Sequence, residues 1–65
     1  MTAEQFSAAG ARIYGLYGWK TQLAKRLGRR RETIARYASG QARIPEAVEL
    51  ALQALEANLI AERTA

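Results

Sequence analysis

Apolar residues recur at spacings of three and four along most of the chain, which is the periodicity of one side of an α-helix. The first such stripe consists of Phe6, Ala9, Ile13 and Leu16. Thr2 precedes this stripe and Gln5 follows Thr2 by three residues, which is the pattern of a capping box. We therefore expect a first helix over residues 3–16. Tyr17 and Gly18 should end it, because glycine readily forms the left-handed turn that closes a helix.

The middle of the chain predicts two short helices separated by a glycine. The first covers residues 19–27 and ends at Gly28, and its inward positions are Leu23, Ala24 and Leu27. The second covers residues 30–38, and one side of it carries Ile34, Tyr37 and Ala38. With successive residues about 100° apart, Glu32 and Arg36 lie near the centre of the opposite side, flanked by Arg31, Thr33 and Ala35. The second helix is therefore amphipathic, with a cationic side that faces outward.

A longer last helix is predicted over residues 45–62, with Pro45 in its first turn, where a missing N–H costs nothing. One apolar stripe, expected to face the first two helices, consists of Val48, Leu52, Leu55 and Leu59. A second stripe around the side consists of Ala47, Leu50, Ala54, Ala57 and Ala61. One small domain cannot bury both stripes, so we expect the second to form the interface of a homodimer. The alternative is that the last turns, residues 57–65, are frayed.

These elements predict an all-α protein, a compact four-helix domain that spans residues 1–65. Helix-favouring residues dominate the composition, and no segment alternates apolar and polar residues as a strand would. A chain of 65 residues buries only about 60% of the surface that its unfolded form exposes, so its stability should be marginal. It contains no Cys and no His, so we expect no disulfide, no metal and no cofactor. Tight helix packing and self-association are the remaining sources of stability.

Signals for a membrane are missing from the sequence. The start, MTAEQFSAAG, has no basic segment followed by an apolar one. No apolar run approaches the roughly 18 residues that a membrane span needs. We expect a cytoplasmic protein with no membrane partner.

Positive charge is concentrated in one third of the chain. Residues 20–43 contain eight Lys and Arg against one Glu, a net charge of +7, whereas the rest contains two Arg against five Glu, a net charge of −3. A segregation of this size favours a surface that binds phosphates or acidic lipids. A membrane-surface peptide would need its cations on one side of one long helix, whereas here they lie in short helices broken by glycine.

Two helices joined by about three residues that include a glycine predict a helix-turn-helix, whose second helix can enter the major groove of DNA. Over roughly residues 13–52 the chain resembles the Cro/repressor-like helix-turn-helix regulators of phages and bacteria. The residues that carry the resemblance are Leu23, Ala24, Leu27, Gly28, Ile34, Tyr37, Gly40, Ile44 and Pro45. The segment is also similar to compact bacterial and prophage regulators, some of which are anti-CRISPR-associated autorepressors.

The resemblance implies a repressor that binds double-stranded DNA in a sequence-specific manner. Members of the family contact base edges from the first exposed residues of the second helix and from one residue a turn later, which here are Arg31, Glu32 and Arg36. Arginine pairs with guanine and glutamate accepts from cytosine, so we expect G·C pairs in the half-site. Phosphate contacts are expected from Lys20, Arg29, Arg30, Thr33, Ser39 and Arg43. A local alternative is that Glu32 and Arg36, four residues apart, pair with each other.

The chain departs from the family at the start of the second helix. A Ser or Thr usually caps this helix, whereas Arg29 and Arg30 stand here and cannot accept a hydrogen bond. A DNA phosphate would relieve both this defect and the unfavourable charge at a positive helix end. The alternative is a solvated charge cluster at a frayed turn. Trp19 either contacts a phosphate or packs in the core as a hydrophobic staple with Leu23, and we favour the core.

A symmetric dimer would bind an inverted repeat whose half-sites lie about 34 Å apart, or a multiple of that. We do not expect an enzyme, because the chain has no His or Cys and its remaining Glu side chains occupy solvent-facing helix positions. The main alternative is an antitoxin or another protein-interaction module whose last helix binds a partner protein.

Overall fold

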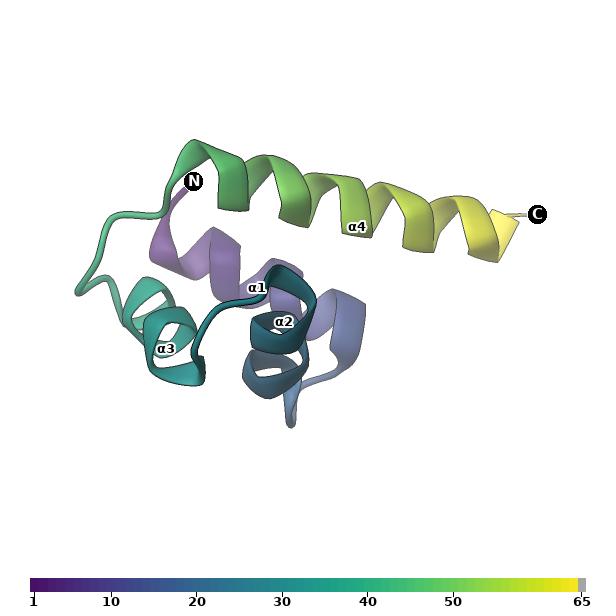
Figure 1. The fold of residues 1–65 in the computed structure, drawn as a ribbon. Coiled ribbons are helices and arrows are strands. Elements are labelled where there is room, and N and C mark those ends of the chain that lie inside the picture. Colours follow the sequence, from purple (N-terminus) through teal and green to yellow (C-terminus); the bar gives the residue numbers. More distant parts are fainter. Residues whose placement is uncertain (65) are drawn as a thin grey trace.

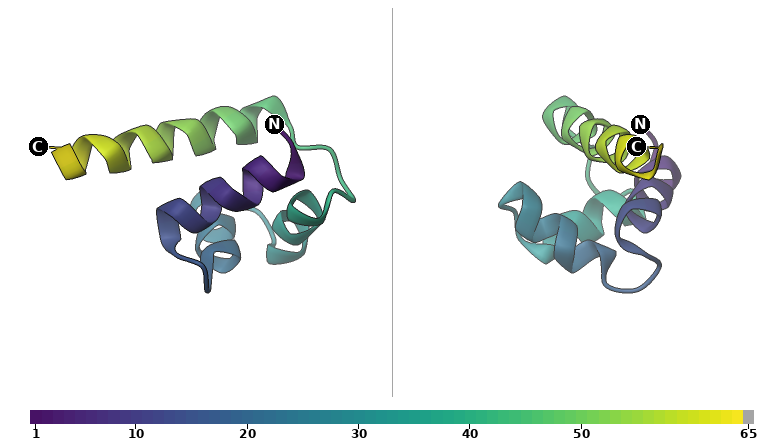
Figure 2. Two further views of the ribbon diagram at one scale, coloured as in Figure 1. Left: turned by 180° about the vertical axis from the view of Figure 1, so that it is seen from behind. Right: turned by 90° about the vertical axis from the view of Figure 1, so that its right-hand side faces the viewer.

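The computed structural model describes residues 1–64 of the chain, with side chains for residues 1–62, and within them it contains four α-helices and no strand. These helices are α1 (Ala3–Tyr14), α2 (Trp19–Leu27), α3 (Arg31–Ser39) and α4 (Glu46–Thr64). The all-α prediction is therefore confirmed. Figure 1 shows α4 along one side of the molecule, with α2 and α3 on the other side, and Figure 2 shows the same arrangement from two further directions. α1 contacts all three of the other helices.

Capping fixes the start of α1 as the sequence predicts, but α1 ends earlier. The Gln5 N–H donates to Thr2 Oγ1 at 3.1 Å, and the Thr2 N–H donates to Gln5 Oε1 at 2.8 Å, which confirms the capping box. The helix ends before residue 16 because Gly15 adopts a φ of 94°. Leu16 is therefore not part of the apolar stripe, and its side chain is 71% exposed. Gly18, the expected end of α1, instead precedes α2.

Trp19 is the first residue of α2 and packs into the core against α1. Its ring lies edge-on to Phe6, with 5.7 Å between ring centroids, and Phe6 makes a similar contact with Tyr37 at 5.8 Å. A Cβ atom on Gly10 would lie 2.2 Å from Trp19 Cε3, so the indole can approach α1 this closely only where α1 lacks a side chain. The expected core position of Trp19 is confirmed. Its role differs, because Trp19 lies inside α2 and is not a staple that precedes it.

Backbone hydrogen bonds close the turn between α2 and α3. Gly28 has a left-handed φ of 67°, and the Arg29 N–H donates to the carbonyl of Ala24 at 2.9 Å. α3 begins and ends one residue later than the sequence predicts. Both helices contribute to one core, whose buried side chains are Phe6, Ala9, Trp19, Leu23, Ala24, Ile34, Tyr37, Val48 and Leu52.

α4 packs mainly on α1, not on both α1 and α2 as expected. Of its inward stripe, Val48 and Leu52 are buried, and Leu55 and Leu59 are half-buried. Pro45 precedes the helix instead of lying in its first turn, and its carbonyl accepts the Val48 and Glu49 N–H groups at 3.1 Å each. Its missing N–H is harmless there too, because the first N–H groups of a helix have no partner inside it.

The backbone of α4 continues to Thr64, two residues beyond the predicted end. The backbone is thus helical over residues 57–64, for which fraying was the alternative, and Ala65 lies outside the described residues. Over the part of the chain that the structure describes, no helix combines the length and the apolar character that crossing a bilayer requires.

Candidate nucleic-acid interface

α3 turns one side to the core and the other to solvent. Ile34 is fully buried and Tyr37 nearly so, which fixes the rotation of the helix about its own axis. Of the candidates for base contact, Glu32 and Arg36 are exposed as a consequence, and Arg31 is exposed as the first residue of the helix. The structure thus places Glu32 and Arg36 on the outward side of one short helix, and Arg31 at its N-terminal end on the side toward α2.

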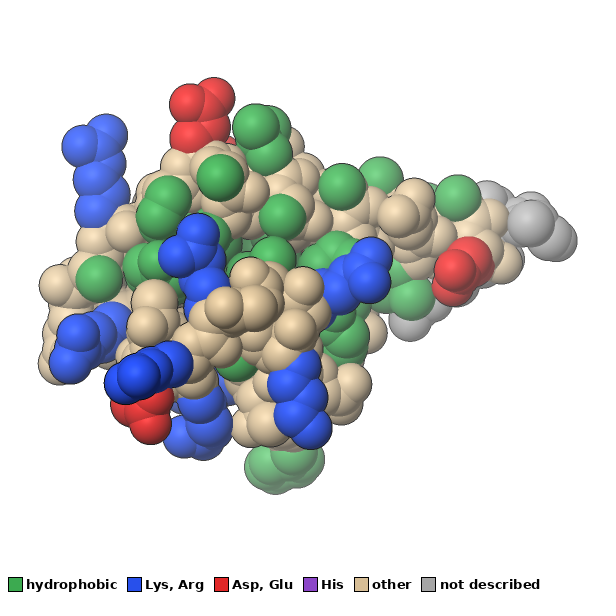
Figure 3. Space-filling model, viewed as in Figure 1, with side chains coloured by type: hydrophobic (Ala, Val, Ile, Leu, Met, Phe, Trp, Pro, Cys, Tyr) green, Lys and Arg blue, Asp and Glu red, His purple; other side chains and the backbone are tan. Residues whose placement is uncertain are grey.

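Positive charge surrounds this helix. Arg29, Arg30 and Arg43 are exposed, and Lys20 is half-buried. Figure 3 shows Lys and Arg side chains over α2, α3 and the segment that leads to α4, whereas acidic side chains lie mostly along α4. Within residues 20–43 the sequence contains one acidic residue, Glu32. The electrostatic potential outside α2 and α3 is therefore positive.

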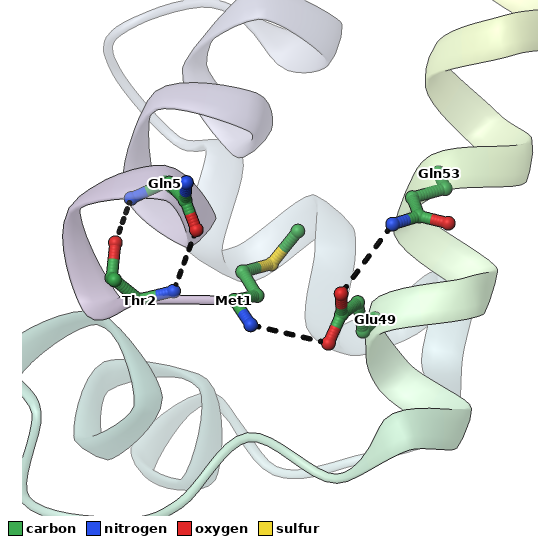
Figure 4. A network of polar contacts seen from close by, with 5 residues as sticks. All are labelled: Met1, Thr2, Gln5, Glu49 and Gln53. Carbon is green, nitrogen blue, oxygen red and sulfur yellow. Dashed lines mark hydrogen bonds and ion pairs between the residues drawn. The ribbon is translucent and has the colours of Figure 1, made fainter.

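Two carboxylates of α4, Glu49 and Glu56, form ion pairs with groups outside α2 and α3. The ion pairs among the described side chains are Arg12–Glu56 and Met1–Glu49. In the first, both carboxylate oxygens lie 3.0 Å from Arg12 Nη2. In the second, the Met1 amino group lies 3.3 Å from Glu49, whose carboxylate also accepts from Gln53 (Figure 4). Within residues 1–62 the structure contains no pair between Glu32 and Arg36, so the local alternative is not formed.

The N-terminal end of α3 has no side-chain cap. Arg30 occupies the N-cap position with an extended backbone, and its side chain makes no capping hydrogen bond. Its carbonyl accepts from the N–H groups of Thr33 and Ile34 at 3.1 and 3.3 Å. The first two N–H groups of α3 point out of the helix end, where the helix dipole is positive. This end of α3 is therefore compatible with an anion.

The predicted phosphate contacts differ in accessibility. The Ser39 hydroxyl donates to the Arg36 carbonyl at 3.2 Å, so its hydrogen is not available to a phosphate in this conformation. Lys20 Nζ lies 5.8 Å from the centroid of the Trp19 ring, a cation–π distance. Thr33 is half-buried. The most accessible of the predicted phosphate contacts are Arg29, Arg30 and Arg43.

Arg31 has a partner that the sequence analysis missed. Its Nε donates to Thr21 Oγ1 at 3.2 Å, which joins α3 to α2. The two residues are ten positions apart and on different helices, so their contact depends on how the helices cross. Helical periodicity relates residues of one helix only, and no signal in the sequence indicates this bond.

The second predicted surface lies on the outer side of α4. Its five side chains, all exposed, are Ala47, Leu50, Ala54, Ala57 and Ala61. At 100° per residue, the centre of this stripe is about 150° away from the side of α4 that packs on α1. Leu50 is 56% exposed, a large fraction for a leucine. The single chain therefore leaves an apolar surface on the outer side of α4.

No family model matches this chain, and no curated protein or solved structure is significantly similar to it.

Proposed function

We propose that the chain is a regulator of transcription that binds double-stranded DNA in a sequence-specific manner and acts as a repressor. In this proposal α2 and α3 form a helix-turn-helix, and α3 is the recognition helix that enters the major groove. The glycine turn at Gly28 and the resemblance of the sequence to Cro/repressor-like regulators support the proposal.

The observation that carries this proposal is that Arg31 and Arg36 are exposed and not neutralised by a carboxylate of the described residues. Both are exposed, Arg36 on the outward side of α3 and Arg31 in its first turn, and the helix is anchored in the core by Ile34. Among the described side chains neither arginine has a carboxylate partner. A rigidly held helix with exposed, unneutralised guanidinium groups fits a polyanion with acceptors at fixed positions, and the major groove admits an α-helix.

The chemistry of the outward side favours G·C base pairs. Arginine donates two hydrogen bonds to guanine O6 and N7, so Arg31 and Arg36 are the proposed guanine contacts. Glu32 is the proposed acceptor for cytosine N4. Arg29, Arg30 and Arg43, with contributions from Lys20 and Thr33, would contact phosphates, which position the protein without selecting sequence.

The outer side of α4 is the proposed homodimer interface. Small alanine side chains allow two helices to approach closely, and Leu50 would be covered in the process. A twofold dimer presents two copies of α3, so the operator would be an inverted repeat with half-sites about 34 Å apart or a multiple of that. Occupation of such a site would block access to a promoter.

A second candidate function is a protein-interaction module, such as an antitoxin, in which DNA binding is secondary. The observation in its favour is the same apolar side of α4, where Leu50 is 56% exposed. In this case a different protein, and not a second copy, would cover that side.

Selection of bound fragments from random duplex DNA, combined with measurement of mass in solution, tests these proposals. If the protein is a repressor, the selection should enrich inverted repeats with G·C pairs in each half-site. The mass in solution should be that of a dimer. If the folded protein enriches no sequence at low salt, the proposed function is wrong. A protein that aggregates alone and becomes soluble only with a co-expressed partner would favour the second candidate.

A further inference from the structure

Arg31 is held by a hydrogen bond that crosses from α3 to α2. Its Nε lies 3.2 Å from Thr21 Oγ1, and both side chains are exposed. Arg36, the other proposed guanine contact, has no such side-chain partner among the described residues. Its carbonyl oxygen accepts hydrogen bonds there, from Ser39 and from the residues that follow α3. The protein therefore orients one of its two proposed guanine contacts and leaves the other unrestrained.

This bond selects which edge of the guanidinium group faces outward. A guanidinium carries five N–H donors, one on Nε and two on each Nη. Thr21 occupies the Nε donor, so the donors that remain for a ligand are those of Nη1 and Nη2. Guanine O6 and N7 accept two parallel hydrogen bonds in the plane of the base. The geometry is thus suited to an end-on contact, with one donor from each Nη.

We propose that Thr21 is a positioning residue that orients Arg31 for this end-on contact with guanine, an inference that rests on the proposed DNA-binding function. An arginine side chain loses rotamer freedom when it is ordered on a ligand. A hydrogen bond that already orders it in the free protein removes part of that loss, which strengthens binding and favours guanine over other bases.

A direct role for Thr21 would look different. Its hydroxyl hydrogen could donate to a phosphate, because the oxygen acts as the acceptor in the bond to Arg31. Such a contact would strengthen binding to every duplex alike, since phosphates carry no sequence information. It would also persist when Arg31 is removed. The two roles therefore differ in specificity and in their dependence on Arg31.

The test is a double-mutant cycle with Thr21→Val, which keeps the shape of the side chain but removes the acceptor. The probes are the fragment that wild-type protein enriches most from random duplex DNA, the same fragment with each G·C pair changed in turn to A·T, and an unrelated duplex. Thr21→Val should weaken binding to the enriched fragment by about 2- to 12-fold, the worth of one hydrogen bond. It should leave the unrelated duplex unaffected. Thr21→Ser keeps the hydroxyl and should restore most of the affinity.

In the Arg31→Ala background, Thr21→Val should have no further effect. The two single variants, Thr21→Val and Arg31→Ala, should lose preference at the same base pair. The proposal is overturned if Thr21→Val binds as tightly as wild type, if it costs as much without Arg31 as with it, or if Arg31→Ala leaves every base preference unchanged. Thermal melting of each variant reports folding, and position 21 is exposed and should tolerate valine. If wild-type protein enriches no fragment, the proposed function fails before the role of Thr21 is reached.

Discussion

Substitution of Gly10 by Ala should destabilise the protein, although the same change strengthens most helices. Gly10 lies inside α1, where the indole ring of Trp19 packs directly on its backbone. An added Cβ would lie 2.2 Å from Cε3, 2.6 Å from Cζ3 and 2.8 Å from Cδ2 of that ring. Trp19 is buried and in edge contact with Phe6, so the ring has little room to move away.

The size of the effect follows from two opposing terms. Ala is more favourable than Gly in a helix interior by about 0.5–1 kcal/mol. Overfilling a packed core costs about 1–3 kcal/mol, and contact with three ring atoms at once favours the upper part of this range. We therefore expect a net loss of about 1–2 kcal/mol. In a domain of this size that loss lowers the melting temperature by about 5–15 °C.

Thermal unfolding followed by circular dichroism measures this effect, and α1 offers a matched control. Ala8 is exposed on the same helix, so Ala8→Gly should also destabilise, by about 1 kcal/mol from helix propensity alone. Alanine is thus the better residue at position 8 and glycine at position 10. Trp19→Phe removes the ring atoms nearest to Gly10, so Gly10→Ala should cost less in that background. A melting temperature that rises in Gly10→Ala would refute the close packing of Trp19 on α1.

Three further predictions concern function. Arg36→Ala should cost about 1–3 kcal/mol on the selected operator and little on random DNA, whereas Arg43→Ala should weaken both alike, as measured by fluorescence anisotropy. Equal losses would show that the base-contacting side of α3 is assigned incorrectly. Operator affinity should fall by about 10³–10⁵ between roughly 50 and 200 mM salt if a dimer neutralises about 6–10 phosphates, and a flat salt response would contradict phosphate contact. Leu50→Glu places a carboxylate in the proposed dimer interface and should yield monomers in sedimentation experiments, whereas an unchanged dimer mass would place the interface elsewhere.

Local patterns in the sequence were sufficient for much of the fold. The capping box is predictable because its two residues, Thr2 and Gln5, are three positions apart on one turn of helix. The phase of the apolar positions places Ile34 inside, and this alone places Arg36 outside, since the two differ by about 200° around α3. The exposure of Glu32 follows from the same periodicity, whereas Arg31, about 60° from Ile34, is exposed as the first residue of the helix.

Contacts between helices were not predictable in this way. Leu16 continues the apolar stripe of α1 in phase, and both Gly15 and Gly18 have a positive φ, so the pattern alone does not determine which glycine ends the helix. The turn must bring Trp19 onto Gly10, and that contact depends on the three-dimensional path of the chain. The bond between Thr21 and Arg31 and the choice of α1 as the main partner of α4 depend in the same way on helix crossing.

α1 contacts each of the other helices, whereas the principal contact of α4 is with α1 and not with α3. The side chains proposed to select DNA lie on α3, and those proposed to select a partner chain lie on α4. These two helices pack on α1 more than on each other. Substitutions on one of these surfaces should leave the other intact. Duplicated copies of such a gene could acquire new operators while their products still exchange subunits, so that mixed dimers would bridge two different half-sites.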